Sequence, residues 1–275
     1  MPSYVAEPPE ARLLQPPRFS LSPNRRTEAA ARRRQLRDLN QAVRNEELTL
    51  QFQPRVRLAY GALAGVDAVV IWPQRRARPI MARRIEPHEH NATLGGWALI
   101  TACNQAAQQP PPNPVWRMSV SIGAEQLSEG VLLSQLADAL HQSALPAERL
   151  ELAFAETILQ DASLDTLLTL SAIRDLGISL SLDAFGTGLA SLAQLKRLPL
   201  TCLKLDSSLI QNVPEHREDS AILRAIIQAG RALGLEIVAC GVDAEAQRGF
   251  LVATDCDCGQ GSLFGLAGAL PVAQR

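Results

Sequence analysis

Apolar segments of the length of β-strands alternate along the chain with stretches in which apolar residues recur at helical spacing. The strand-like segments are 48–58, 63–72, 115–122, 149–154, 178–183, 201–206, 235–240 and about 252–256. The helical stretches include 94–108, 131–143, 163–175, 189–196 and 219–232. This alternation is typical of a parallel sheet covered by helices. Eight strands in a chain of 275 residues predict a closed α/β barrel.

The first two strands depart from this order because only the residues Ala59 to Ala62 connect them. A parallel crossover needs about a dozen residues or more, so these two strands are expected to pair as an antiparallel hairpin. The proline-rich run 110–114 is expected to form a rigid loop before the third strand, since proline cannot donate a ladder hydrogen bond.

The first 47 residues lack the pattern of the barrel. Residues 1–23 are rich in proline and have no apolar period, which predicts a flexible leader. Residues 24–47 combine clustered arginines with an apolar stripe at helical spacing, which predicts an amphipathic helix. That helix is either a solvated element packed on the domain edge or a basic arm that binds a partner. Residues 48–275 are assigned to the barrel domain.

Composition excludes several classes of protein. The net charge of −1 predicts binding neither to a nucleic-acid polymer nor to an acidic membrane. The apolar runs are shorter than the roughly 18 residues that span a bilayer, and the N-terminus does not resemble a signal peptide. The five cysteines are odd in number and lie in apolar contexts, which favours reduced thiols in a cytoplasmic protein.

Polar side chains at the carboxyl ends of the strands are the candidate chemistry, because these ends converge on one face of a barrel. Acids stand at Asp67, Asp183 and Asp206, but Asp183 is followed by Ala184, where a second acid would complete a metal-binding pair. A two-metal site needs several carboxylates to offset the charge of two cations. Three acids alone would supply too few oxygen ligands for even one hard cation, which prefers several.

Seven ordered segments give the chain its resemblance to a known family. They are FQPRV (52–56), GVDAVVIW (65–72), SVSIGAEQL (119–127), LELAFAET (150–157), the block from LDAFGTG to LKLD (182–206), GLEIVACGVDAEAQ (234–247) and GQGSLFG (259–265). From about Leu36 to Pro271 the chain resembles the EAL domain, the cyclic-di-GMP phosphodiesterase module of bacteria. The resemblance implies a modified TIM-type (β/α)₈ barrel with an antiparallel first strand, in agreement with the predicted hairpin.

The resemblance implies roles for the residues that match the family pattern. Gln53 matches an early glutamine that contacts the ligand, and Gln260 matches a late glutamine. Asp183 matches a metal ligand, and Lys204 matches the lysine that helps to activate the attacking water. Glu156 matches a glutamate that steadies a nearby loop.

Other positions depart from the family pattern. Asp67 replaces the signature glutamate, a metal ligand, and draws the carboxylate back by one methylene. Ile71 replaces the arginine that holds a ligand phosphate. Further family ligands are replaced by Ser121, Ala153, Ala184 and Cys240. These losses lead us to expect that divalent-metal binding is lost, that no catalytic residue remains functional and that the chain is not an enzyme.

The sequence thus predicts a catalytically inactive EAL-like regulator in bacterial cyclic-di-GMP signalling, which controls motility, pili or biofilm. It would act through contacts with an unidentified protein, and a homodimer is a further expectation. Weak cyclic-di-GMP binding would use Gln53, Asp67, Asp183, Lys204, Asp206 and Gln260. Two alternatives stay open: a phosphodiesterase of low or altered activity that uses the remnants Asp67, Asp183, Lys204 and Glu156, and a pure cyclic-di-GMP receptor.

Two further segments have alternative interpretations. The segment MARRIEPHEHN (81–91) stands where the family has an apolar pattern near the mouth of its ligand site. The difference reflects either sequence drift or a surface for a different partner. Its residues His88 and His90 indicate a solvated loop more than a metal site. Cys256 and Cys258 are expected to alternate on the last strand as core thiols.

Overall fold

The computed structural model describes residues 23–74, 81–86, 89–109, 116–128, 130–159, 163–188 and 192–271. The predicted leader up to residue 22, the loop 110–114 and His88 lie outside these residues. The chain divides into two units, Met1–Asp38 and Leu39–Arg275. Helix α1 (Pro23–Arg44) crosses this division, and its residues Leu39 and Ala42 are buried in the core of the second unit. The predicted division into the segments 1–23, 24–47 and 48–275 stays a prediction.

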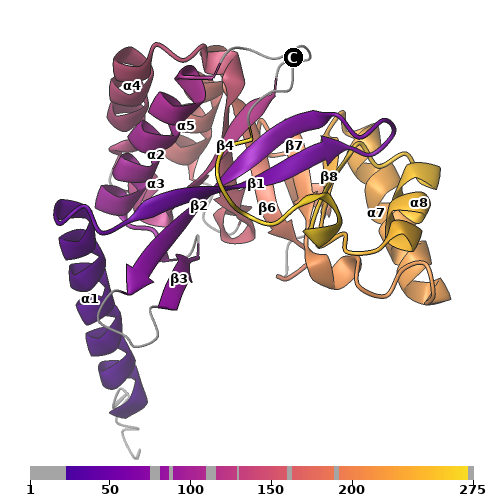
Figure 1. Ribbon diagram of the computed structural model, residues 1–275, viewed down its shortest axis with the longest axis horizontal. Coiled ribbons are helices and arrows are strands. Elements are labelled where there is room, and N and C mark those ends of the chain that lie inside the picture. The colour runs from indigo at the N-terminus through magenta and orange to yellow at the C-terminus, as the bar shows by residue number, and fades with distance from the viewer. Residues whose placement is uncertain are drawn as a thin grey trace, which may run out of the picture. The chain divides into compact units, whose positions relative to one another are not determined.

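Nine strands form the sheet of the second unit: β1 (Thr49–Arg57), β2 (Leu63–Gln74), β3 (Met81–Ile85), β4 (Arg117–Ile122), β5 (Leu150–Ala155), β6 (Ser179–Phe185), β7 (Cys202–Leu205), β8 (Glu236–Cys240) and β9 (Cys258–Gln260). Their order is β1-β9-β8-β7-β6-β5-β4-β2-β3, and a β1–β2 pairing closes eight of them into a barrel. The sheet occupies the middle of the unit in Figure 1. The predicted barrel is confirmed.

Strand β1 is antiparallel to both of its neighbours, β2 and β9, whereas the strands from β4 to β9 pair in parallel. The turn from β1 to β2 contains Gly61, whose φ of 72° lies in the left-handed region that favours glycine. Gly61 N donates a hydrogen bond to Arg57 O across this turn. The predicted hairpin and the antiparallel first strand are therefore both present.

Helices cover the outside of the barrel, with α2, α4 and α5 beside one part of the sheet and α7 and α8 beside another (Figure 1). Their bounds are α2 (Ala92–Ala107), α3 (Ala124–Ser128), α4 (Leu132–Ser143), α5 (Leu164–Asp175), α6 (Leu192–Leu195), α7 (Arg217–Ala232) and α8 (Glu245–Ala253). Short 3₁₀ turns are η2 (Ala147–Arg149), η3 (Glu156–Leu159), η4 (Ser207–Leu209) and η5 (Ser262–Phe264). Among the described residues, no helix is long and apolar enough to cross a membrane.

Local sequence explains where the helices begin and which face they bury. The side chains of Asn91 and Ser163 accept hydrogen bonds from backbone amides in the first turns of α2 and α5, which satisfies donors that a helix start leaves unpaired. Helix α7 buries Leu223, Ile227 and Gly230 against the barrel, an apolar stripe at helical spacing.

Two parts of the sheet differ from the prediction. Residues 252–256 are not a strand, because Val252 and Ala253 end α8 and Asp255, with a φ of 60°, turns the chain before β9. Cys256 therefore precedes the last strand, although it is buried and all five cysteines are free thiols as expected. Strand β3 was not predicted, and it forms by antiparallel pairing with the end of β2.

Candidate functional site

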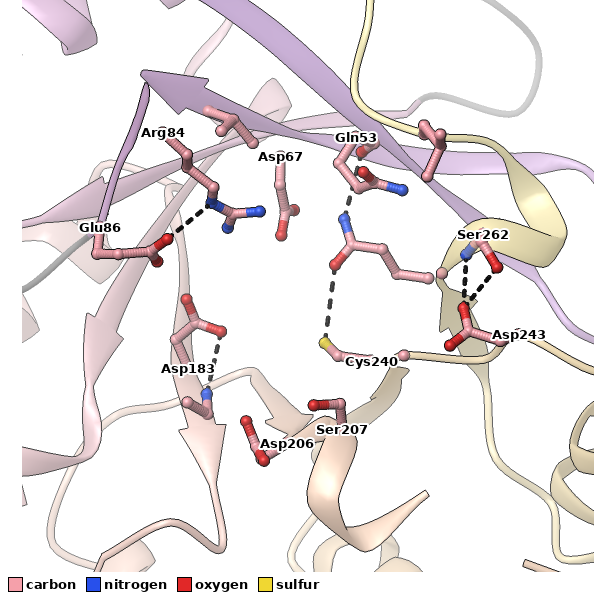
Figure 2. A pocket seen from close by; sticks show the side chains of 16 residues that line it. Gln53, Asp67, Arg84, Glu86, Asp183, Asp206, Ser207, Cys240, Asp243 and Ser262 are labelled. Atoms are coloured by element: carbon pink, nitrogen blue, oxygen red, sulfur yellow. Dashed lines mark hydrogen bonds and ion pairs between the residues drawn. The ribbon is translucent and has the colours of Figure 1, made fainter. Parts of the chain in front are cut away.

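A cavity of about 440 Å³ lies at the face of the barrel where the carboxyl ends of β6, β7, β8 and β9 meet. Figure 2 shows side chains from β1, β2, β3 and these strand ends pointing into the same space. The residues that line it are Gln53, Asp67, Val69, Arg84, Glu86, Asp183, Ala184, Asp206, Ser207, Cys240, Gly241, Asp243, Gln260, Gly261, Ser262 and Leu266. We call this cavity the mouth pocket.

The structure brings together most of the residues that were predicted to bind a ligand. Gln53, Asp67, Asp183, Asp206 and Gln260 all line the mouth pocket. Gln260 Nε2 donates to Gln53 O at 3.3 Å, and Gln53 Nε2 donates to Gly265 O, so both amides are held in place. Whether these side chains contact a nucleotide stays a prediction.

Lys204 lies beneath the mouth pocket, with 1% of its side chain exposed. Its Nζ lies 2.8 Å from Asp67 Oδ2, 2.9 Å from Ser119 Oγ and 3.5 Å from Glu151 Oε1. Burial disfavours the ammonium, but the carboxylates of Asp67 and Glu151 outweigh it and hold the pKa of Lys204 above its ordinary value. Lys204 is therefore a cation at neutral pH.

A second buried ion pair supports this lysine from below. Arg55 Nη1 and Nη2 each lie 3.0 Å from one oxygen of Glu151, and both side chains are almost fully buried. Burial alone would raise the pKa of Glu151, but Arg55 and Lys204 together lower it. Sequence reasoning missed Arg55, Ser119 and Glu151, because no local pattern links residues so far apart in the chain.

Asp183 occupies the end of β6 beside a strained backbone. Its Oδ1 accepts a hydrogen bond of 3.0 Å from Ala184 N, and Ala184 has a φ of 53°, in the left-handed region. Desolvation raises the pKa of Asp183, more than the charge of Lys204 lowers it. A further cation in the mouth pocket would therefore stabilise the ionised form of this carboxyl group.

The loop after β6 is tied to the 3₁₀ turn η3. Gly188 N donates to Glu156 Oε2 at 3.0 Å, and a Cβ at Gly188 would lie only 3.0 Å from the same carboxylate. Glu156 is buried. Glu156 thus ties this loop to η3, whereas its role in the family pattern, in binding or in catalysis stays a prediction.

Three family ligand positions hold side chains that carry no charge at neutral pH. Ala153 is buried in β5, and Ala184 lines the mouth pocket. The Cys240 thiol lies 3.7 Å from Gln260 Oε1, and burial raises its pKa above the ordinary value. Cys240 is therefore a neutral thiol at neutral pH.

A group of three residues that could hold a metal ion lies at the amino-terminal ends of the parallel strands, not at the mouth pocket. One ligand atom each of Glu151, Cys202 and Glu236 falls within 4.8 Å of the other two. Glu236 is also paired with Arg57 Nη1 at 2.6 Å and Arg117 Nη1 at 3.4 Å.

The mouth pocket offers a second set of oxygen ligands. Asp67 Oδ1 is buried and has no hydrogen-bond partner among the described residues, although such atoms normally have one. Asp183 lines the same pocket. A carboxylate oxygen that lacks a donor beside a second carboxylate fits a divalent cation.

Comparison with known proteins gives the family. The family model for the EAL domain matches residues 36–267. The bifunctional diguanylate cyclase/cyclic di-GMP phosphodiesterase MucR of Pseudomonas aeruginosa is 35% identical over 236 residues, which cover 84% of this chain and 34% of MucR. The cyclic di-GMP phosphodiesterase NbdA of the same species is 36% identical over 233 residues, 82% of this chain and 30% of NbdA. The chain thus spans about a third of the length of these relatives.

Solved structures agree on the fold. The MucR phosphodiesterase in complex with c-di-GMP superimposes with a TM-score of 0.76 at 33% identity, over 86% of this chain and 98% of that chain. The EAL domain of FimX from Pseudomonas aeruginosa bound to c-di-GMP has a TM-score of 0.75 at 17% identity, over 87% and 98% of the two chains. At that identity the FimX likeness shows the fold alone.

Two sequence-based predictions are wrong in the light of these findings. The chain was expected not to be an enzyme, but two of the relatives that match more than four fifths of it, MucR and NbdA, are named as phosphodiesterases. Divalent-metal binding was expected to be lost, but the group Glu151, Cys202 and Glu236 brings three ligand atoms together, and Asp67 Oδ1 lacks a hydrogen-bond partner. From its matched residues, its barrel and these relatives, the chain belongs to the EAL domain family.

Proposed function

We propose that this chain is a cyclic-di-GMP phosphodiesterase domain of low or altered activity, acting in bacterial cyclic-di-GMP signalling. The observation that carries the proposal is the contact between Lys204 and Asp67 beneath a pocket that Asp183 also lines. Relatives that are named as phosphodiesterases support the reaction class. The bound ligand of the MucR structure supports the substrate class.

The residues at the mouth pocket would have separate roles in such a reaction. Asp67 and Asp183 would hold a divalent cation, which when bound lowers the pKa of water and offsets the charge of a phosphodiester. Lys204 Nζ holds Asp67 Oδ2 and so fixes the orientation of this carboxylate, whose Oδ1 is buried and has no hydrogen-bond partner among the described residues. Gln53 and Gln260, fixed by their own hydrogen bonds, present amide groups to a polar ligand.

The altered ligand set predicts a slower reaction than the family pattern would support. Ala153, Ala184 and Cys240 supply no anionic oxygen, and the carboxylate of Asp67 is one methylene shorter than that of glutamate. Fewer anionic ligands hold a cation less tightly and neutralise less of its charge. We therefore expect turnover that depends strongly on the concentration of Mg²⁺ or Mn²⁺.

The test is a turnover assay with the purified chain, cyclic-di-GMP and either Mg²⁺ or Mn²⁺, with the linear product separated by chromatography. We expect metal-dependent product that Asp183→Asn abolishes. Asp175→Asn, an exposed aspartate at the end of α5, is the matched control and should retain the wild-type rate. Binding of cyclic-di-GMP without product at any metal concentration would contradict hydrolysis and assign the receptor role instead.

The earlier expectations of a protein partner, a homodimer and a cytoplasmic location remain part of this proposal. Light scattering of the purified chain across a concentration series tests the homodimer. A mass that stays at that of the monomer, 29.7 kDa, would contradict it.

A further inference from the structure

We infer that Arg84 supplies the guanidinium that contacts a phosphate of the nucleotide, an assignment that rests on the proposed function. Arg84 lies on β3, a strand that sequence reasoning did not predict, and it lines the mouth pocket. Figure 2 shows its two terminal nitrogens pointing towards the middle of the pocket, on the side where Asp67 also lies.

The pairing of β2 with β3 explains how Arg84 reaches this place. Asp67, Val69 and Ile71 share one face of β2, because successive side chains of a strand alternate. Asp67 and Val69 line the mouth pocket. Arg84 is the antiparallel partner of Ile71, and directly paired residues present their side chains on the same face of a sheet. The guanidinium therefore starts beside Ile71 and extends over the pocket.

The charged side chains that line the mouth pocket are mostly acidic, so a basic side chain among them matters for binding an anion. The lining includes five acidic side chains, which repel an anionic ligand: Asp67, Glu86, Asp183, Asp206 and Asp243. Among the residues that the structure describes, Arg84 is the one basic residue in the same lining. Lys204 lies below and is already paired with Asp67 and Glu151. Among the described residues of the pocket, Arg84 is therefore the side chain that attracts a phosphate electrostatically.

Glu86 positions the guanidinium without neutralising its outer edge. Glu86 Oε1 lies 3.5 Å from Arg84 Nε, and both side chains remain about half exposed. An ion pair through Nε leaves Nη1 and Nη2 on the pocket side of the group (Figure 2). A guanidinium can bind two phosphate oxygens at once through its parallel N–H groups.

The test is calorimetric titration of the folded chain with cyclic-di-GMP, once in EDTA, which also prevents turnover, and once with Mg²⁺. Arg84→Ala should weaken binding about tenfold or more, because a charge-assisted hydrogen bond is lost. Arg84→Lys should bind with intermediate affinity, since it keeps the charge but not the two parallel donors. Arg44→Ala, at the exposed end of α1, is the matched control and should bind like the wild type.

A second-site variant separates a phosphate contact from a general loss of structure. The double variant Arg84→Ala with Ile71→Arg places a guanidinium on the paired residue, on the same face of the sheet. We expect this variant to recover most of the affinity for cyclic-di-GMP that Arg84→Ala loses. Rising salt should weaken binding of the wild type more than that of Arg84→Ala, because the lost contact is ionic. Guanosine, which has no phosphate, should bind the wild type and Arg84→Ala equally.

The outcomes distinguish this inference from the proposed function. If Arg84→Ala binds cyclic-di-GMP as tightly as the wild type, the assignment of Arg84 is overturned whatever the turnover assay shows. If the wild type binds in an Arg84-dependent way but forms no product, the assignment stands and hydrolysis fails. If the wild type binds in neither buffer, both are overturned.

Discussion

Lys204 Nζ lies 2.8 Å from Asp67 Oδ2, although 137 residues separate the two side chains in the sequence. The contact joins β7 to β2 across the inside of the barrel and continues below through Glu151 to Arg55. Four alternating charges thus run from the mouth pocket into the core. The other oxygen of Asp67 is buried and lacks a hydrogen-bond partner among the described residues, in a side chain that lines the mouth pocket.

The first prediction concerns the lysine of this network. Lys204→Met removes the cation that Asp67 and Glu151 share and leaves Arg55 as the partner of Glu151; breaking a buried ion pair costs about 3–5 kcal/mol. We expect the free energy of unfolding, measured by urea denaturation, to fall by about that amount. Phosphodiesterase turnover should fall as well, because Asp67 is no longer oriented.

The chain contains a matched control for this substitution. Lys196, the only other lysine, is exposed, and Lys196→Met should change the free energy of unfolding by less than about 0.5 kcal/mol. Equal effects at the two positions would contradict a structural role for the Lys204–Asp67 contact.

The second prediction is a dependence of stability on pH that originates at Glu151. The pKa of Glu151 is lower in the folded protein than in the unfolded chain, where it is about 4.3. A carboxyl group with a lowered folded pKa stabilises the fold above its unfolded pKa, and this stabilisation is lost as the pH falls through the folded pKa. Stability should therefore decline when the pH drops below about 4.3.

The variant Glu151→Gln isolates this contribution. At pH 7 it leaves Arg55 without its buried counter-charge and Lys204 with Asp67 alone, so we expect the free energy of unfolding to fall by about 3 kcal/mol or more against the wild type. The difference should shrink as the pH falls below about 4.3, since the unfolded wild-type chain then binds a proton at Glu151 before the folded protein does. Glu148→Gln, at an exposed position in η2, should follow the wild type at every pH. A difference that stays constant from pH 7 to pH 3 would refute the assignment.

The sequence was sufficient to predict the barrel because its signals are local. Apolar runs of strand length, helical spacing between them and the short link before Leu63 specify the order and direction of most strands. The strand ends then placed Asp183, Asp206 and Gln260 at one face, which is where they lie.

What the sequence could not show depends on contacts between distant segments. Strand β3 carries two adjacent arginines, and it becomes a strand because the end of β2 offers unpaired backbone groups. The run from Phe250 to Val252 is equally compatible with a strand or a buried helical stripe, and the helix α8 is what forms. The partners of Lys204 lie on other strands, so no spacing in the chain reveals them.

The third prediction concerns the loop after β6. Glu156→Ala removes the acceptor of the Gly188 amide, and we expect faster hydrogen exchange at this amide together with lower turnover. Thr157→Ala alters the exposed neighbouring residue and should change neither quantity. Unchanged exchange at Gly188 in Glu156→Ala would show that other contacts hold the loop.

The fourth prediction decides between the two sets of ligands that could hold a divalent cation. In the group of Glu151, Cys202 and Glu236, both carboxylates already have arginine partners, and burial keeps the Cys202 thiol protonated by raising its pKa. A hard cation entering there would have to displace guanidinium groups.

In the mouth pocket, by contrast, Asp67 Oδ1 has no donor to lose. Electron paramagnetic resonance of Mn²⁺ titrated into the chain should therefore show binding that Asp67→Asn or Asp183→Asn weakens about tenfold or more, since each variant removes an anionic ligand. Cys202→Ala should leave the Mn²⁺ affinity unchanged. The opposite result, with Cys202→Ala abolishing binding and both aspartate variants retaining it, would move the metal to the amino-terminal end of the barrel and separate it from the pocket in which we place the nucleotide.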